Sequence, residues 1–391
     1  MNSKIALFSA LLLAVCLTQF AVDIYAPAIL AIASDLKVDI TLVQWSMSIY
    51  MVGVAVSQLI YGPLSEGIGR KKPLLFGLGV MFVGCLICLN ASHIDILITG
   101  RFVQGAGAGA CAALWRSIFR DSFQGEELST YGSYLGTVIK FIMPAAPLLG
   151  SYLLINHGWL ANFLFMAFYT VIAILCILFL FTETNKTHHR DNLKLSYVAH
   201  NYCRLLKSKL FMGVTFSTFL TYGAFFSWFV TGPVILIKDI GITPLYFGWL
   251  NFSCGAVSCG TAAWINGKYV KKFGMSNMLR FGWSMVLLSG ISMLVGKYIF
   301  GLNTMAVMLP VMILFFGVTF IWPNLFAIAF TPYGDIAGYA GSLYGFMQVI
   351  GGAVVSASLA LLPENDQTIF AACIIVCASI AWTVYEKVAR T

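Results

Sequence analysis

The chain has 391 residues, of which 60% are hydrophobic and only 10% are charged, against the roughly 25% charged residues of an ordinary soluble domain. This composition excludes a water-soluble globular protein, and almost all of the chain is expected to lie in lipid. The net charge is +8. The Lys and Arg residues fall mainly in loops, without the interleaved aromatic residues of a nucleic-acid surface, so nucleic acid is not an expected partner.

Twelve apolar runs of membrane-spanning length follow one another along the chain, separated by polar residues or by Gly and Pro. They cover 5–30, 43–64, 74–89, 96–118, 129–154 and 160–181, then 210–231, 246–265, 278–295, 305–330, 339–362 and 369–385. The longest polar stretch, 182–209, separates the two sets of six. We therefore predict an all-α membrane protein of twelve transmembrane helices, arranged as six-helix bundles over 1–181 and 210–391 and joined by a linker.

The basic residues are distributed unevenly between the two sides that these runs define. Eighteen lie in the termini, the linker and the even-numbered loops, Arg116 and Arg120 among them, whereas the other loops hold only Lys37, Lys238 and Lys297. The positive-inside rule therefore predicts that both termini and the linker are cytoplasmic. The first run is longer than a signal peptide and is predicted to be a retained helix. We expect a monomer in a bacterial inner membrane.

Three ionisable residues lie deep within the apolar runs, namely Asp23, Arg101 and Lys140. Such residues are costly in lipid, at least about 2.5 to 3.5 kcal/mol each, and they are therefore candidates for function. The alternative is a buried ion pair that only holds helices together. Because two cations and one anion cannot cancel, a substrate anion at Lys140 or loss of the Lys140 proton would relieve the imbalance.

The second half of the chain is rich in aromatic and small polar residues at membrane depth. Such side chains suit a mostly apolar pocket with a few orienting hydrogen bonds, although aromatic residues also fill cores and interfacial belts. The predicted substrate-binding residues of the first half are Lys140 and two residues near the buried charges, Tyr25 and Gln104. Those of the second half are Tyr222, Phe226, Trp322, Asn324, Tyr344 and Gln348.

Two local patterns bear on how the helices pack and move. The run GAGAGA at 105–110 follows no strand, so it predicts close helix packing rather than a phosphate loop. Pro144 and Pro147 are expected to bend the fifth helix, as alternating access requires. We find no Walker sequence, metal-ligand cluster or catalytic constellation, so we expect no enzyme activity and no cofactor, with a proton gradient as the energy source.

Several segments carry a resemblance to a known family. The segment 62–71, GPLSEGIGRK, resembles the cytoplasmic loop signature of the major facilitator superfamily. Arg101, Gln104, Gly105 and Gly109 resemble its fourth-helix motif. The segments DIYAP at 23–27, RSIFRD at 116–121 and APLLG at 146–150 are similar to its bicyclomycin-resistance (Bcr/CflA) branch of drug/proton antiporters.

The resemblance implies roles for several residues. It implies that Arg101 takes part in proton coupling, with Asp23 as the expected proton carrier. It also implies a gating cluster of Glu66, Arg70, Arg120 and Asp121 at the cytoplasmic face, although Glu66 stands where the family usually has Asp. Pro144 and Pro147 complete the predicted gating residues.

The predicted function is proton-coupled export of a small molecule by alternating access, of the multidrug type. Two alternatives remain at this point. One is a transporter of an anionic metabolite, such as a carboxylate siderophore or an organic acid, because Lys140 is unexpected in a drug exporter. The other is a transporter-like receptor that no longer cycles.

Overall fold

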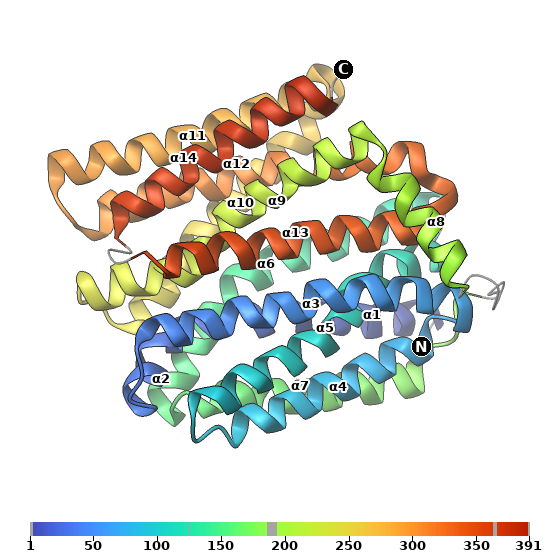
Figure 1. The fold of residues 1–391 in the computed structure, drawn as a ribbon, viewed down its shortest axis with the longest axis horizontal. Coiled ribbons are helices and arrows are strands. Elements are labelled where there is room, and N and C mark those ends of the chain that lie inside the picture. Colours follow the sequence, from blue (N-terminus) through green and yellow to red (C-terminus); the bar gives the residue numbers. More distant parts are fainter. Residues whose placement is uncertain (1–2, 124, 186–193, 363–365, 390–391) are drawn as a thin grey trace.

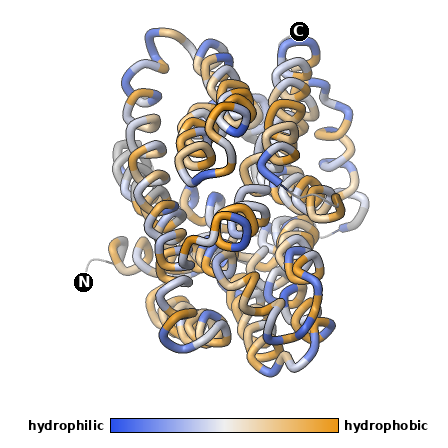
Figure 2. Tube along the Cα trace, turned by 90° about the vertical axis from the view of Figure 1, so that its left-hand side faces the viewer, coloured by the Kyte–Doolittle hydropathy of each residue, from blue (hydrophilic) through white to orange (hydrophobic). Residues whose placement is uncertain are grey.

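The structure is a computed structural model that describes residues 3–123, 125–185, 194–362 and 366–389, with only the backbone described at some positions, Lys140 among them. The described residues form α-helices connected by short turns, and most of the helices run along one common direction (Figure 1). Figure 2 looks along the helices and shows them gathered into two groups, with hydrophobic residues over most of their length.

The first half contains the helices that precede the linker. Their bounds are α1 (Ser3–Asp23), the short helix η1 (Ala26–Ala28), α2 (Ile29–Asp35), α3 (Ile40–Ile68), α4 (Lys71–Leu89), α5 (Ile94–Ser122), α6 (Gly125–His157) and α7 (Leu160–Leu180). Within the linker, α8 (Leu195–Leu206) crosses one end of the bundle (Figure 1).

The second half repeats this arrangement. Its helices are α9 (Lys209–Pro233) with η3 (Val234–Asp239), α10 (Pro244–Phe273), α11 (Met275–Phe300), α12 (Thr304–Phe330) with η4 (Thr331–Ile336), α13 (Ala337–Ala360) and α14 (Gln367–Val384) with η5 (Tyr385–Ala389). Among the described residues, nine helical segments are long and apolar enough to cross a membrane. The remaining long helices, α5, α6 and α10, are more polar, and together they match the predicted twelve-helix fold.

The two ends of the bundle differ in what they carry. We call the end with the α3–α4 turn and α8 the linker end, and the opposite end the far end. At the far end, α3, α10 and α12 are preceded by the N-cap residues Asp39, Thr243 and Asn303, whose side chains accept hydrogen bonds from backbone N–H groups of the first turn. These caps satisfy donors that a helix start leaves unpaired, so each helix begins at a defined residue.

The glycine run of α5 packs this helix tightly between α3 and α4. A methyl group on Gly105 would meet the backbone carbonyl of Tyr50, and one on Gly107 would meet the backbone of Gly77 and Met81. Small residues let helix backbones approach closely in a membrane. The predicted packing role of the GAGAGA run is therefore confirmed.

The two halves meet along two helix pairs, α3 with α13 and α6 with α10. Toward the far end, Gln44 Nε2 donates to the carbonyl of Val230 at 2.9 Å, and the hydroxyls of Ser48 and Ser356 lie 3.0 Å apart. At the linker end, the Tyr202 hydroxyl on α8 donates to the Leu59 carbonyl on α3 at 3.0 Å. Hydrogen bonds thus join the two halves toward the far end and join the linker helix to the first half at the linker end.

Candidate functional site

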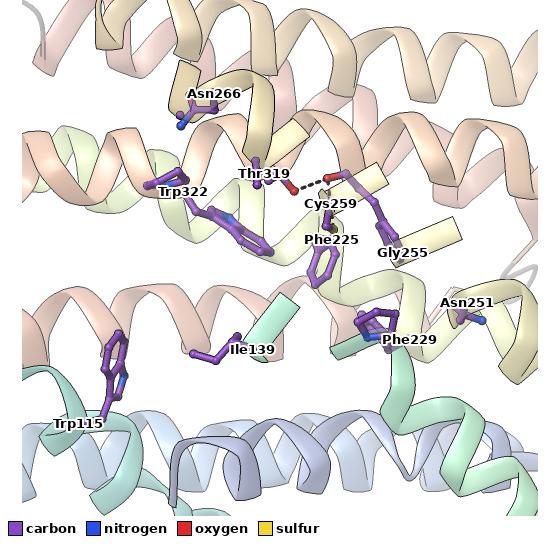
Figure 3. Close-up of a pocket in the computed structure, with 15 residues that line it drawn as sticks. Trp115, Ile139, Phe225, Phe229, Asn251, Gly255, Cys259, Asn266, Thr319 and Trp322 are labelled. Atoms are coloured by element: carbon purple, nitrogen blue, oxygen red, sulfur yellow. Dashed lines mark hydrogen bonds between the residues drawn. The ribbon is translucent and has the colours of Figure 1, made fainter. Parts of the chain in front are cut away.

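A cavity of about 550 Å³ lies between the two halves. Helices α5 and α6 line it from the first half, and α9, α10 and α12 line it from the second (Figure 3). Its described lining residues are Trp115, Ile139, Pro144, Phe225, Phe229, Asn251, Gly255, Cys259, Ala263, Asn266, Gly267, Phe315, Thr319, Trp322 and Pro323. The volume falls in the range of about 300 to 1,000 Å³ that is typical of small-molecule sites.

Aromatic rings form much of the wall. Phe225 and Phe229 stand one turn apart on α9, so both present their rings to the same side. The Phe225 ring meets Trp322 edge-on at 4.9 Å between centroids and lies 5.2 Å from Phe315. Such tilted and edge-on pairs are favourable between aromatic rings. The rings support one another through these contacts and form a continuous wall.

A few polar groups interrupt this apolar wall. Asn251 accepts a hydrogen bond from Trp228 Nε1 at 2.7 Å, and Asn266 accepts one from Asn324 Nδ2 at 2.9 Å. Thr319 donates its hydroxyl to the Phe315 carbonyl at 2.8 Å. None of the described lining residues carries a charge. The cavity therefore offers orienting amides within an apolar, aromatic surface.

The cavity extends along much of α10. Asn251 and Asn266 lie 15 residues apart on this helix, about 22 Å at 1.5 Å per residue. Asn251 is nearer the far end and Asn266 nearer the linker end, where Trp115 and Trp322 also stand (Figure 3). The contacts of Gln44 and Ser48 with the second half close the helices together at the far end.

Four of the predicted substrate residues gather at this cavity. Trp322 lines it, and the Tyr222 ring packs against Trp322 with centroids 5.5 Å apart. Phe226 stacks on Tyr222 at 6.2 Å, one layer behind the wall. Asn324 holds Asn266 by the hydrogen bond described above. The structure thus brings these four residues together, one on the wall and three supporting it.

The other predicted substrate residues lie elsewhere. Tyr344 and Gln348 belong to α13, where the Tyr344 hydroxyl lies 3.2 Å from Thr218 Oγ1, and neither is among the lining residues. Lys140 follows the lining residue Ile139 on α6, but its side chain lies outside what the structure describes. Its predicted contact with an anionic substrate stays a prediction.

Arg101 is enclosed within the first half. Its side chain is buried, with Cζ 4.2 Å from the ring centroid of Tyr50 and 4.7 Å from that of Tyr25. One guanidinium nitrogen donates to the Ala21 carbonyl at 3.1 Å and to Gln104 Oε1 at 2.6 Å. Tyr25 and Gln104 therefore hold Arg101 in this structure, and neither is a described residue of the cavity wall.

Asp23 is the last residue of α1 and is buried. No described residue forms an ion pair with its carboxylate or donates a hydrogen bond to it. The alternative of an ion pair with Arg101 is not found among the described residues, and Arg101 instead donates to the Ala21 carbonyl and Gln104. The Tyr222 phenol of the second half lies in the neighbourhood of this carboxylate.

The predicted gating residues of the α3–α4 turn lie together at the linker end. The buried Arg70 pairs with Asp121 at 3.0 Å and with Glu66 at 3.0 Å, and it also donates to Ser65 Oγ at 2.6 Å. Arg120 lies at the periphery, 3.9 Å from Asp121. A methyl group on Gly338, near the start of α13, would meet the Glu66 carboxylate. The cluster thus touches the second half.

Glu183 belongs to the same cluster, and sequence reasoning missed it. Its carboxylate accepts hydrogen bonds from the backbone N–H groups of Arg70 at 2.8 Å, Lys71 at 3.0 Å and Asn185 at 2.9 Å. Partial burial opposes its charge, but these donors outweigh burial and hold the pKa of Glu183 below its ordinary value. Its position as an acidic residue just after the sixth apolar run was the feature of the sequence that could have indicated this role.

The two prolines of α6 lie where this helix meets the other half. Pro144 lines the cavity, and a methyl group on Gly255 of α10 would meet its ring. The Pro147 carbonyl accepts a hydrogen bond from Ser151 Oγ at 2.8 Å, so this oxygen is satisfied within the helix. A methyl group on Gly248 of α10 would approach the Pro147 carbonyl, so both prolines face the second half, and their role in gating stays a prediction.

Two halves of membrane-spanning helices around a central cavity define the class of this protein as a transporter-type, multi-pass membrane protein. The family model described as Major Facilitator Superfamily matches residues 11–356, and the chain belongs to this family.

The relatives found by comparison extend along most of the chain. A bicyclomycin resistance protein homolog of Haemophilus influenzae is 29% identical over 352 residues, which is 88% of this chain and 86% of the relative. Multidrug resistance protein D of Escherichia coli is 28% identical and covers 93% of this chain and 91% of its own. A chloramphenicol resistance protein of Pseudomonas aeruginosa is 26% identical, covering 89% and 82% respectively. The predicted resemblance to the bicyclomycin-resistance branch is confirmed.

Solved structures share the fold. The crystal structure of the peptide transporter POT in complex with sulfate superposes with a TM-score of 0.75 and covers 98% of this chain and 95% of its own, at 15% identity. At this identity the likeness establishes the fold alone.

Proposed function

We propose that this protein exports small, largely apolar molecules across the membrane in exchange for protons, by alternating access. The observation that carries the proposal is the aromatic cavity of about 550 Å³ between the two halves. A cavity at the interface of two repeats is where transporters of this architecture place their substrates. The names of the relatives, which refer to bicyclomycin, multidrug and chloramphenicol resistance, support efflux of the drug type.

Asp23 is the proposed proton carrier. A membrane-buried carboxylate is costly when charged, and no described residue compensates it, so gaining and losing a proton changes its free energy strongly. Arg101 couples to it through the backbone, because its guanidinium holds the carbonyl of Ala21, two residues before Asp23. Protonation at the end of α1 is thereby linked to the packing of α1 against α5.

The proposed orientation follows from the basic residues. With both termini and α8 in the cytoplasm of a bacterium, the linker end faces the cytoplasm and the far end faces the periplasm. Cysteines replacing the exposed residues Ser92 and Ser196, each in a Cys203→Ser background, test this. An impermeant thiol reagent added to cells whose outer membrane is permeabilised should label position 92 and leave position 196 unlabelled. The reverse pattern would contradict the orientation.

The transport proposal is tested with purified protein in proteoliposomes. Acid-interior vesicles should accumulate labelled chloramphenicol or bicyclomycin above the external concentration, because outward proton movement drives substrate inward. A protonophore should abolish the accumulation, and protein-free vesicles should show none. Equal uptake with and without the gradient would contradict proton coupling. Binding without any movement would favour the non-cycling receptor.

A further inference from the structure

Arg116 of α5 is a cation to which the proposed transport mechanism assigns no role. It follows the cavity residue Trp115, and its Cζ lies 4.6 Å from the Trp115 ring centroid. The same atom lies 5.2 Å from the ring centroid of Phe326, which belongs to α12 in the other half. Trp115 stands at the end of the cavity where Asn266 and Trp322 also lie (Figure 3).

The guanidinium of Arg116 has aromatic neighbours but no acceptor. None of the described residues forms an ion pair with it or accepts a hydrogen bond from it. The side chain is only partly exposed, so bulk water does not fully solvate it. Aromatic faces attract a guanidinium, but they leave its N–H donors, which point outward in the guanidinium plane, without partners.

The two buried arginines of the first half both donate to oxygen atoms, although Nε and one terminal nitrogen of Arg101 have no partner. Arg70 donates to two carboxylates and a hydroxyl. Arg101 is enclosed by Tyr25 and Tyr50 and donates to a carbonyl and an amide. Arg116 alone of these three lacks an oxygen partner among the described residues. A partly buried guanidinium without an acceptor gains from pairing with an anion.

The arrangement of the N–H groups of Arg116 indicates which kind of acceptor group would pair with them. A guanidinium presents parallel N–H groups that match the two oxygens of a carboxylate, and such pairs are short and strong. Two rings lie close to the guanidinium carbon, those of Trp115 and Phe326. The adjoining cavity is apolar and aromatic, so the rest of the ligand should be apolar as well.

We propose that Arg116 binds a carboxylate of the transported molecule, so that the preferred substrates are aromatic or apolar molecules with a single negative charge. The inference rests on the proposed transport function and names the substrate class for the same cavity. The carboxylate would occupy the linker end of the site, beside Trp115, and the apolar body would lie against the rings of α9 and α12.

Binding of a matched series of naphthalenes to the purified protein tests the inference. Calorimetric titration compares 1-naphthoate, 1-naphthamide and 1-naphthylmethylammonium, which share the ring and differ in charge. The wild type should bind naphthoate at least about tenfold more tightly than the other two, which corresponds to about 1.4 kcal/mol. Equal affinities in the wild type would overturn the proposal, whatever any variant does.

Variants of Arg116 separate recognition from a structural role. Arg116→Gln should lower naphthoate affinity at least tenfold more than naphthamide affinity, and Arg116→Lys, which keeps the charge but not the fork, should recover part of the difference. Lys271→Gln removes an exposed positive charge at the linker end and is the control. An equal loss for all three ligands in Arg116→Gln would assign Arg116 to holding the halves together through Phe326, against the proposal.

The experiments test the transport function and the carboxylate site independently of each other. If wild-type vesicles accumulate chloramphenicol under a proton gradient while naphthoate and naphthamide bind equally, only the carboxylate site is overturned. If no accumulation occurs but naphthoate binding is selective and depends on Arg116, the carboxylate site stands and the transport function does not.

Discussion

At the scale of single residues, the proposed proton coupling depends on Asp23. Its carboxylate is buried at the end of α1, with no ion-pair partner among the described residues. Asp23→Asn keeps the size and polarity of the side chain but cannot take up a proton. We expect proton-driven accumulation in vesicles to fall to the level of protein-free vesicles.

The elution volume and melting temperature of the Asn variant should match those of the wild type. Asp95→Asn, which changes an exposed carboxylate at the start of α5, is the control that should still transport. Accumulation at the wild-type level in Asp23→Asn would remove Asp23 from the mechanism.

The aromatic contact between Tyr50 and Arg101 predicts different effects for two substitutions of Tyr50. The Tyr50 ring lies against the guanidinium at 4.2 Å, whereas its buried hydroxyl has no hydrogen-bond partner. Tyr50→Leu removes the ring and should destabilise the protein by about 2 kcal/mol, because a desolvated cation loses its aromatic neighbour. Tyr50→Phe removes only the unpaired hydroxyl and should be neutral or stabilising. Thermal unfolding in detergent measures both. Equal melting temperatures of the two variants would contradict the role of the ring.

At the scale of elements, the contact between α3 and α5 depends on glycine. Gly105→Ala places a methyl group against the Tyr50 carbonyl, which as backbone cannot move away easily. Overpacking of this kind costs about 1 to 3 kcal/mol. Gly79→Ala in α4 is the matched control, because a methyl group there meets nothing within 4 Å, and helix propensity favours alanine. Melting temperatures should fall for Gly105→Ala and stay or rise for Gly79→Ala. The opposite order would contradict the close packing.

The start of α4 depends on Glu183, which predicts a pH dependence. The pKa of Glu183 lies below its ordinary value of 4.5 in the folded protein. A lowered carboxylate pKa stabilises the folded state above the ordinary value, and this contribution disappears as the pH falls through the folded pKa. Glu183→Gln should therefore melt at a lower temperature than the wild type near neutral pH.

The difference between Glu183→Gln and the wild type should shrink as the pH is lowered past 4.5. Thermal unfolding over a pH series measures it. Thr182→Val, at an exposed neighbouring position, should show no such trend. A difference that stays constant with pH would show that the Glu183 charge does not stabilise this turn.

At the scale of the whole molecule, alternating access requires the halves to separate at each end in turn. The hydroxyls of Ser48 on α3 and Ser356 on α13 lie 3.0 Å apart between the halves. The double variant Ser48→Cys with Ser356→Cys should form a disulfide under oxidation. Transport should then fall at least about tenfold and return on reduction, because a cross-linked far end cannot open.

Each single cysteine variant, treated with the same oxidant, controls for the ten native cysteines. Mass spectrometry of the digested protein establishes the cross-link. Full transport by the cross-linked protein would rule out separation of α3 from α13 at this level.

The fold could be predicted from the sequence because lipid leaves a chain few choices. Backbone polar groups must be paired within the membrane, so each long apolar run becomes a helix. Twelve such runs divided by one long polar stretch therefore indicate two bundles, and the glycines of α5 indicate a close contact. The buried charges Asp23 and Arg101 were also recognisable, because their cost in lipid marks them.

Only the tertiary structure decided which side chains meet. Lipid is as apolar as leucine, so hydropathy does not tell which face of a helix turns toward a neighbour, and that face is chosen by shape and hydrogen bonding. Arg101 therefore contacts the rings of Tyr25 and Tyr50 and forms no ion pair with the described Asp23. Arg116, counted from the sequence as a loop charge, lies between aromatic rings of the two halves for the same reason.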